Sequence, residues 1–395
     1  DSDEDRRGEP PEITLTQQQV QVIAAENRFG LNLFREVQAR ETDANLFISP
    51  LSVSMALGMA LNGAAGDTRA EMEAALALAG LTPEEINTSY RDLIDLLAGL
   101  DPNVAFEIAN SVWYRQSFSV EQPFLDVNRT YFDAEIAALD FNSPEAPRTI
   151  NQWVDKKTRG KIEEIIQGPI DPLTMLYLIN AVYFKGDWLY RFDEDATQDD
   201  TFTREDGSTV PVRMMRMAEV SLPYVATPTF EAVDLPYGDS LFSMTVLLPH
   251  EDQRLEDIVA ALNETNWNEW TTGLQPRTFE RVELPRFRME YEVELKDMLA
   301  ALGIESAFDP TRSDFSAINP AHDDLHISKV KHKTFIEVDE RGTEAAAVTA
   351  VEISVTSAGP QPRPVFRVDR PFAFVLREQA TGTILFIGQV THPAV

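Results

Sequence analysis

The sequence ERGTEAAAVTAVEISVTSA, residues 340–358, decides how the whole chain is interpreted. From Thr343 onward, every second residue is small or β-branched. Successive side chains of a β-strand point to opposite faces, so this alternation is typical of a strand with one buried face. The set predicted to face inward comprises Thr343, Ala345, Ala347, Thr349, Val351, Ile353 and Val355, whereas both carboxylates, Glu344 and Glu352, belong to the other set.

The sequences on either side of this stretch indicate where a strand could begin and end. The sequence FIEVDE, residues 335–340, alternates apolar and acidic residues and predicts a preceding strand. Three prolines follow at 360, 362 and 364. Proline removes a ladder hydrogen bond, so the stretch can form a strand as far as about Ala358. A surface loop of this length would normally be polar and rich in Gly, Asn and Asp, and this one is not.

Two interpretations of the stretch follow from the pattern. It is an ordinary strand of a sheet, or it is a latent strand, held outside a sheet and able to insert when its far end is cut. In the second case the small side chains of Ala345, Ala346 and Ala347 would ease threading between neighbouring strands. Gly342 would then supply the hinge.

Composition limits the classes of protein further. Of the 395 residues, 43% are hydrophobic and 25% are charged, which suits a globular chain with a large core. The formal net charge of −31 disfavours nucleic acid and membrane surfaces as partners and favours a monomer. No apolar run reaches the roughly 18–20 residues needed to span a bilayer. The absence of cysteine excludes disulfides, thiolate catalysis and cysteine-ligated metal sites.

The order of the elements predicts an α+β fold. Residues 1–14 form a predicted disordered acidic lead-in, and no linker divides residues 15–395, although the length alone would allow two or three domains. Helices are predicted over residues 16–40, from Ser49-Pro50 to Asn62-Gly63, from a Thr68–Glu71 capping box to Gly80, and over 83–97, 150–166, 255–262 and 294–302. Strands are predicted over residues 104–114 and 175–184, within 210–249, and through most of the remainder.

No catalytic motif stands out. The sequence lacks a nucleotide-binding glycine loop, an H-E-x-x-H zinc motif and a G-x-S-x-G elbow, so no catalytic residue, cofactor or metal site is assigned. His322 and His326 lie four residues apart beside two aspartates. Pro320 and the strand-like sequence that follows disfavour a helix there, so solvated loop residues are the better interpretation. The 65 acidic residues leave a hydrolase with paired carboxylates as a formal alternative.

Motifs in register cover nearly everything after the lead-in. They are Asn45-Leu-Phe-Ile-Ser-Pro-Leu-Ser52, Asn151-Gln-Trp-Val through Thr158-Arg-Gly-Lys-Ile162, Asn180-Ala-Val-Tyr-Phe-Lys-Gly-Asp-Trp188, Leu284-Pro-Arg-Phe287, the hinge Glu340-Arg-Gly-Thr-Glu-Ala-Ala-Ala347, Asp369-Arg-Pro-Phe372 and Phe386-Ile-Gly-Gln-Val390. With these motifs the chain resembles the serpin family of serine protease inhibitors. The resemblance implies one metastable domain of three β-sheets, about eight or nine helices and an exposed reactive loop at about residues 341–364.

The resemblance also implies a function and its partner. A serine protease attacks the loop and forms a covalent acyl-enzyme. The freed segment then inserts into the large sheet and carries the protease across the molecule before deacylation. Such a protein is an inhibitor and not an enzyme, and it needs no cofactor.

The resemblance assigns roles position by position. It places Ser49, Ser52, Asn180 and His332 in a polar cluster, the shutter, where the strands of the sheet part. It places Trp188, Arg286 and Glu340 in the breach, at the top of the sheet where the loop enters, and an ion pair between Glu340 and Arg286 is expected there. The hinge comprises Gly342, Thr343, Glu344, Ala345, Ala346 and Ala347.

The cleaved bond follows from counting. Taking Glu340 as the seventeenth residue before the cut places the bond between Thr356 and Ser357. Counting back from Arg370-Pro371 leads instead to about Pro360, where proline suits cleavage poorly, so Thr356 is preferred. An uncharged β-branched residue there favours elastase-like or subtilisin-like proteases, and Arg363 would be a trypsin-like site only in a very different register.

Some alternatives concern activity and location. A non-inhibitory serpin, acting as a chaperone or carrier, is the second interpretation, but the hinge from Thr343 to Val348 holds only one charge, Glu344. A heparin-like polyanion is not expected as a partner, because residues 83–97 carry four acidic residues and one arginine. The start at Asp1 would suit a removed secretory leader, so an extracellular location is expected, and a cytoplasmic one is not excluded.

Overall fold

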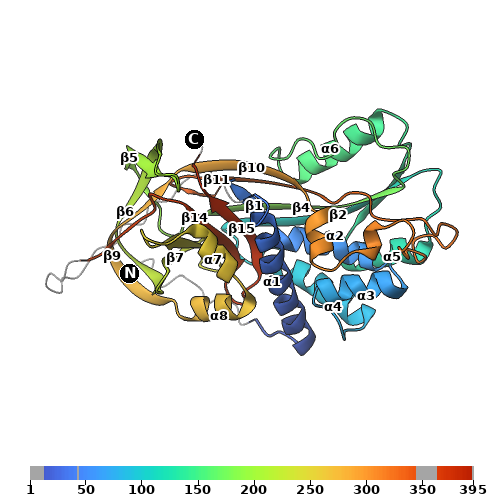
Figure 1. Ribbon diagram of the computed structural model, residues 1–395, viewed down its shortest axis with the longest axis horizontal. Coiled ribbons are helices and arrows are strands. Elements are labelled where there is room, and N and C mark those ends of the chain that lie inside the picture. Colours follow the sequence, from blue (N-terminus) through green and yellow to red (C-terminus); the bar gives the residue numbers. More distant parts are fainter. Residues whose placement is uncertain (1–12, 42–43, 344–362, 394–395) are drawn as a thin grey trace.

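Apolar periodicity in the first part of the chain does form helices. The computed structural model describes residues 13–41, 44–343 and 363–393. Ser49 caps its helix as expected, accepting a hydrogen bond from the Ser52 amide, and Thr82 forms a capping box with Glu85. The helices of this part are α1 (Gln17–Gln38), α2 (Pro50–Leu61), α3 (Gly66–Ala75), α4 (Pro83–Leu97), α5 (Gln122–Phe132) and α6 (Glu145–Lys157) (Figure 1).

Two predicted helices differ from the structure at both of their ends. Helix α3 begins at Gly66, before Thr68, and ends at Ala75 rather than at Gly80. The hydroxyl of Thr68 does not cap the helix; it accepts from the Asp314 amide at 2.9 Å. The helix expected over residues 150–166 begins earlier and stops at Lys157, because Arg159 (φ 51°) and Gly160 (φ 82°) adopt left-handed conformations.

One sheet contains β11, which includes the first four residues of the predicted strand FIEVDE and ends before Asp339. Its order is β10-β11-β12-β4-β2-β3. Along β11 alternate residues are buried, from His332 to Val338, which is the predicted two-residue period. The strands are β2 (Val104–Arg115), β3 (Glu135–Leu139), β4 (Leu176–Asp187), β10 (Phe287–Glu294), β11 (Lys331–Val338) and β12 (Gly342–Thr343).

The other sheet has nine strands, because β6 joins two of the three expected sheets. Strand β6 (Thr209–Ala226) pairs with β5 and β9 along most of its length and with β7 at its end. The remaining strands are β1 (Leu46–Ile48), β5 (Asp193–Thr203), β7 (Phe230–Tyr237), β8 (Phe242–Pro249), β9 (Gln275–Pro285), β13 (Val365–Arg367), β14 (Phe372–Glu378) and β15 (Ile384–Val390). Helices α7 (Leu255–Ala261), α8 (Glu264–Thr272) and α9 (Lys296–Ala301) bring the α-helices of the described ranges to nine.

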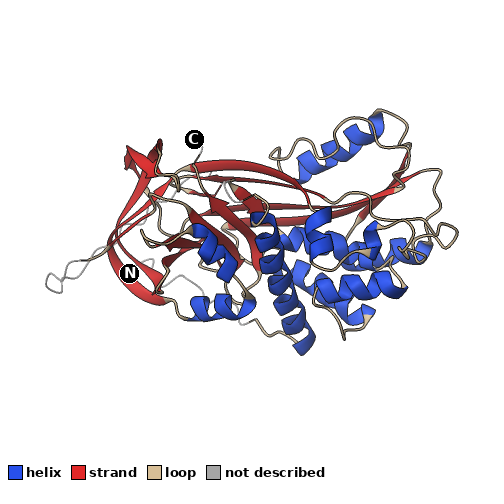
Figure 2. Cartoon of the chain, in the orientation of Figure 1, coloured by secondary structure: helices blue, strands red, loops and turns tan. Residues whose placement is uncertain are grey.

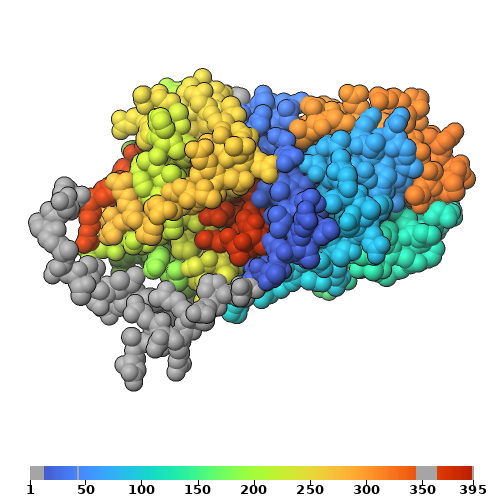
Figure 3. Space-filling model, turned by 90° about the horizontal axis from the view of Figure 1, so that it is seen from below, coloured from blue at the N-terminus to red at the C-terminus, as the bar shows by residue number. Residues whose placement is uncertain are grey.

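The six-stranded sheet runs along the long axis of the molecule, with α6 on one face and α2 to α5 on the other (Figures 1 and 2). We call the face that α6 covers the front. Trp153 and Ile150 of α6 pack there against Ile179 and Ala181 of β4. On the molecular face of Figure 3, α1 lies between α7 and α8 on one side and the early helices on the other. No helix in the described ranges has the length and apolar character needed to cross a membrane.

Candidate functional site

Strand β12 separates β4 from β11 at the place where the deciding stretch begins. Thr343 pairs with Val338 of β11 on one side and with Gly186 of β4 on the other. In the described part of the chain, β4 pairs only with β2 and β12, and β11 only with β10 and β12. Beyond β12, residues of β4, β11, α2 and α6 line a cavity of about 1290 Å³. A gap is therefore present between β4 and β11 along the direction in which the chain continues from Thr343.

The two described hinge residues are fixed tightly in this gap. A Cβ atom on Gly342 would lie 2.1 Å from the carbonyl oxygen of Gly186, so only glycine allows this approach to β4. The Thr343 side chain faces inward and is 3% exposed. Its hydroxyl is hydrogen-bonded to the Tyr237 hydroxyl at 2.6 Å. The other predicted hinge residues, Glu344, Ala345, Ala346 and Ala347, lie outside the described residues.

The predicted breach residues meet at the same end of the sheet. Arg286 Nε donates to Glu340 Oε1 at 2.8 Å, and Arg286 Nη2 lies 2.7 Å from Glu340 Oε2. The expected ion pair is thus present, with both carboxylate oxygens close to the guanidinium. Glu340 is 2% exposed and also accepts a hydrogen bond from the Thr197 hydroxyl. The pair ties the residues before the hinge to the turn between β9 and β10.

Trp188 links the breach to the hinge. Its indole stacks on the Tyr237 ring with centroids 4.2 Å apart. Its Nε1 donates to the Asp339 carbonyl at 2.9 Å, and its amide donates to the Arg341 carbonyl at 2.8 Å. The chain immediately before Gly342 is therefore held by both the side chain and the backbone of Trp188.

The predicted shutter residues form a buried polar cluster beneath the gap. The amide of Ser49 donates to His332 Nε2 at 3.0 Å, and the Ser49 hydroxyl donates to the Leu385 carbonyl at 2.8 Å. Asn180 Nδ2 donates to Asn110 Oδ1 at 2.8 Å, and Ser52 lies 3.5 Å from the Asn180 carbonyl oxygen. These contacts connect α2 to β4 and β11, the two strands that flank the gap.

Burial controls the charge of the shutter histidine. His332 is 5% exposed, and desolvation lowers its pKa from 6.5 to about 4. Its Nε2 accepts the Ser49 amide hydrogen, which requires an unprotonated nitrogen at that position. The ring is accordingly neutral at physiological pH.

The predicted reactive bond lies outside the described residues, as do Thr356 and Ser357 themselves. On the far side of the loop, β13 begins at Val365 and pairs in parallel with β9. Arg367 of β13 bridges Glu283 and Asp200. The two ends of the stretch between Thr343 and Arg363 are therefore anchored in different sheets.

Several residues of the site were not predicted from the sequence. Tyr237, Thr197 and Asn110 contact the hinge, the breach and the shutter respectively. They come from β7, β5 and β2, far away in the sequence, so no local spacing indicates them. His322 is in a loop against the ring of Phe118, and the described residues contain no group of three or more metal-ligating side chains.

The sequence is similar to a known protein family and to individual proteins of that family. The family described as Serpin (serine protease inhibitor) matches residues 24–393. The leukocyte elastase inhibitor of Sus scrofa is 37% identical over 383 residues, covering 94% of this chain and 100% of its own. Iripin-2 of Ixodes ricinus is 35% identical, covering 96% of this chain and 95% of its own.

The fold of the chain is also similar to solved serpin structures. The native state of tengpin, a thermophilic serpin, superposes with a TM-score of 0.83 at 30% identity, covering 96% of each chain. Human thyroxine-binding globulin in complex with thyroxine gives a TM-score of 0.85 at 28% identity, covering 96% of this chain and 100% of its own. The family match, the relatives and the superposed folds all extend over nearly the whole chain, and this chain therefore belongs to the serpin family.

Proposed function

We propose that this chain inhibits a serine endopeptidase as a suicide substrate. The protease serine Oγ attacks the carbonyl carbon of Thr356, the peptide bond breaks, and Ser357 leaves with a free, protonated amino group. The segment before the cut then inserts between β4 and β11 as a new strand, with the protease attached to it as an ester. Covalent capture and insertion together stop the protease before it is released.

The observation that carries this proposal is the register of β12. Thr343 already lies between Val338 of β11 and Gly186 of β4. If that register continues, residue 349 comes to lie between His332 and Asn180. Residue 353 then reaches Leu176, the first residue of β4. A strand continued from Thr343 would thus follow both flanking strands to their far ends.

The same register assigns the faces of the new strand. Thr343 points inward, and alternate residues of β11 such as Ile336 also point inward. The inward positions after Thr343 are then the odd-numbered residues from Ala345 to Val355, which are the small and β-branched set of the sequence pattern. Their burial, together with new ladder hydrogen bonds on both edges, would supply the free energy of insertion.

One orphaned polar atom fits this account. Asn180 Oδ1 is buried and has no hydrogen-bond partner among the described residues. Such atoms are rare because desolvation without a hydrogen bond is unfavourable. In the continued register Thr349 would lie beside Asn180, and its hydroxyl could donate to this oxygen. Insertion would then supply the missing hydrogen bond of Asn180 within the shutter.

The class of target follows from the predicted bond. Thr356 is uncharged and β-branched, which favours elastase-like or subtilisin-like proteases. The relatives named leukocyte elastase inhibitor agree with this choice. The likeness to thyroxine-binding globulin supports a second candidate, a carrier of small molecules that does not capture proteases.

The deciding experiment is incubation of the full chain with elastase-, subtilisin-, chymotrypsin- and trypsin-like enzymes. We expect an SDS-stable complex with the first or second, and a released peptide that begins at Ser357. Sequencing of that peptide locates the bond and distinguishes Thr356 from a site near Pro360. Cleavage without any stable complex would contradict inhibition and favour the carrier.

A further inference from the structure

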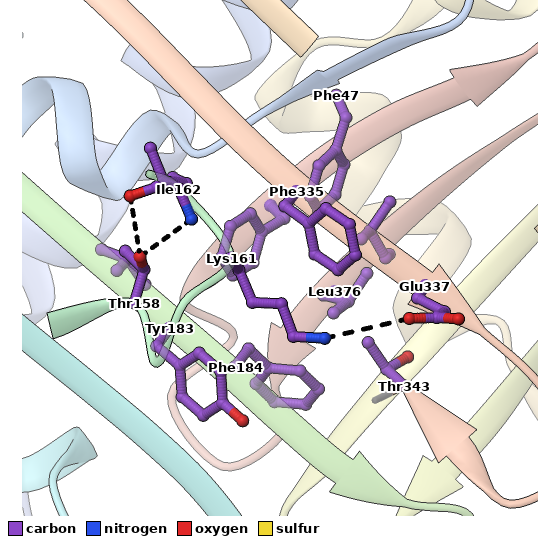
Figure 4. Close-up of a pocket in the computed structure, with 13 residues that line it drawn as sticks. Phe47, Thr158, Lys161, Ile162, Tyr183, Phe184, Phe335, Glu337, Thr343 and Leu376 are labelled. Carbon is purple, nitrogen blue, oxygen red and sulfur yellow. Dashed lines mark hydrogen bonds and ion pairs between the residues drawn. The ribbon is translucent and has the colours of Figure 1, made fainter. Parts of the chain in front are cut away.

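A short segment after α6 crosses the front of the gap between β4 and β11. Residues 158–162 come directly after α6 and include the left-handed residues Arg159 and Gly160. The Thr158 hydroxyl stabilises the turn by accepting from the Ile162 amide at 3.0 Å. In Figure 4, Lys161 lies between residues of β4 and β11, close to Thr343. The segment thus lies over the beginning of the gap.

Lys161 binds β11 from this segment. Its Nζ lies 3.9 Å from Glu337 Oε2 and 4.9 Å from the centre of the Phe335 ring. Glu337 and Phe335 are both outward-facing residues of β11, two positions apart on the same strand. Lys161 therefore combines an ion pair with a cation–π contact on the same strand. We call Lys161, Glu337 and Phe335 the clasp.

The same segment is fixed to the other side of the gap. Arg159 forms an ion pair with Glu107 of β2. Its guanidinium also lies 4.7 Å from the centre of the Tyr183 ring of β4. Two basic residues only two positions apart thus contact opposite sides of the gap. Since β12 pairs with β4 at two residues and with β11 at Thr343 alone, the segment adds a second connection just beyond it.

We propose that Lys161 is a positioning residue for strand insertion, and that the clasp must open before a strand can advance past Thr343. This inference rests on the proposed function, because it concerns the insertion step. The outward side chains of an inserting strand would emerge beside Glu337 and Phe335, where the Lys161 side chain now lies. The clasp therefore slows the advance of a strand into the gap.

The expected effect is on a rate and not on the fold. The side chains of Lys161 and Glu337 are 27% and 42% exposed, so their attraction is partly screened by water and salt. Loss of one such ion pair and one cation–π contact should accelerate insertion about three- to tenfold. Arginine at position 161 keeps the charge and should preserve the native rate.

The test measures uptake by the full-length chain of a synthetic peptide with the sequence of residues 344–356, because Thr343 of the chain already lies between β4 and β11. Peptide uptake, followed by native gel mobility and by tryptophan fluorescence, does not require a protease. We compare wild type with Lys161→Met, Lys161→Arg and Glu337→Gln. The matched control is Lys157→Met, because Lys157 also lies over an aromatic ring, that of Trp153, but stays within α6.

We expect faster uptake by Lys161→Met and Glu337→Gln, and wild-type rates for Lys161→Arg and Lys157→Met. Raising the salt from about 0.05 M to about 0.5 M should accelerate wild type more than Lys161→Met. Equal rates in wild type, Lys161→Met and Lys157→Met would overturn the inference. Failure of wild type to trap any protease, while peptide uptake still depends on Lys161, would instead refute the proposed function and support the clasp.

Discussion

Arg286 Nη2 lies 2.7 Å from Oε2 of Glu340, and this pair ties the residues just before the hinge to the connection between β9 and β10. Arg286 occupies the turn between β9 and β10, whereas Glu340 follows β11 and precedes Gly342. The carboxylate is almost fully buried, while the arginine side chain is 38% exposed. The pair therefore stabilises the closed end of the sheet chiefly by satisfying Glu340.

Replacement of Glu340 by lysine should destabilise the end of the six-stranded sheet where Arg286 and Glu340 meet. Glu340→Lys places a cation beside Arg286 and removes the acceptor of the Thr197 hydroxyl. We expect a loss of roughly 1–3 kcal/mol in stability, below the full value for a buried pair because Arg286 is partly exposed. After mild heating, size-exclusion chromatography should show latent or polymeric forms. Glu340→Gln, which keeps an acceptor for Thr197, should show a smaller effect, and an unchanged monomeric profile of the lysine variant would refute the prediction.

Replacement of Thr343 should leave cleavage of the loop by the protease intact but prevent formation of the stable covalent complex. Thr343→Arg would force a long charged side chain into the inward position now occupied by a 3% exposed threonine. The proposed strand could then not advance, so the protease should cleave the loop and escape. Gel electrophoresis should show cleaved chain and almost no SDS-stable complex, with at least a tenfold rise in the moles of inhibitor consumed per mole of protease, as expected for burial of an unpaired charge. Thr343→Ser retains the hydroxyl for Tyr237 and serves as the control; similar trapping by both variants would contradict the insertion step.

Helices were predictable where local signals determine them. The cap at Ser49 fixes the start of α2, as expected, and α4 spans the predicted residues 83–97 with an additional cap at Thr82. The end of α6 was missed because a non-glycine residue, Arg159, takes the left-handed turn. Helices α5 and α8 were also missed; α8 is short and its start depends on an asparagine cap at Asn263.

The candidate site was predictable only in part, because some of its residues come together through packing of elements far apart in the sequence. Motif resemblance named Glu340, Arg286 and His332; the structure gives their contacts, and the roles assigned to them stay predictions. It assigned no role to Tyr237 or to Lys161, which reach the gap from β7 and from the segment after α6. Their contacts depend on how separate elements pack, and no spacing along the chain encodes such packing.

The buried histidine of the shutter should make the protein sensitive to acid. The pKa of His332 is about 4 in the fold and ordinarily 6.5, so the unfolded chain binds a proton at a pH where the folded chain does not. Its contribution to stability is complete above pH 6.5 and is lost as the pH falls towards 4, by roughly 3 kcal/mol in total. His332→Gln keeps an acceptor for the Ser49 amide but cannot titrate. Urea unfolding at pH 7.5 and pH 5 should show a smaller loss for this variant than for wild type, and equal losses would argue against the assignment.

A buried glutamate among the helices should act in the opposite direction. Glu26 of α1 is 3% exposed and faces the hydroxyls of Ser54 and Tyr90, with Tyr90 donating to Oε1 at 2.8 Å. Burial raises the pKa of Glu26 from 4.5 to about 7, because neither neighbour supplies a positive charge. Between these two values the unfolded chain loses its proton first, so stability falls as the pH rises from 4.5 to 7 and is constant above that.

Glu26→Gln should therefore stabilise the protein in neutral and alkaline solution only. The amide keeps the shape and the hydrogen-bonding capacity of the protonated acid but has no proton to lose. We expect a gain that approaches roughly 3 kcal/mol at pH 8 and vanishes near pH 4.5. The control is Glu36→Gln on the same helix, where the carboxylate pairs with Arg40 at the surface and a change within about 0.5 kcal/mol is expected at both values of pH. An equal effect of Glu26→Gln at both values would mean that packing, and not the proton of Glu26, governs this part of the core.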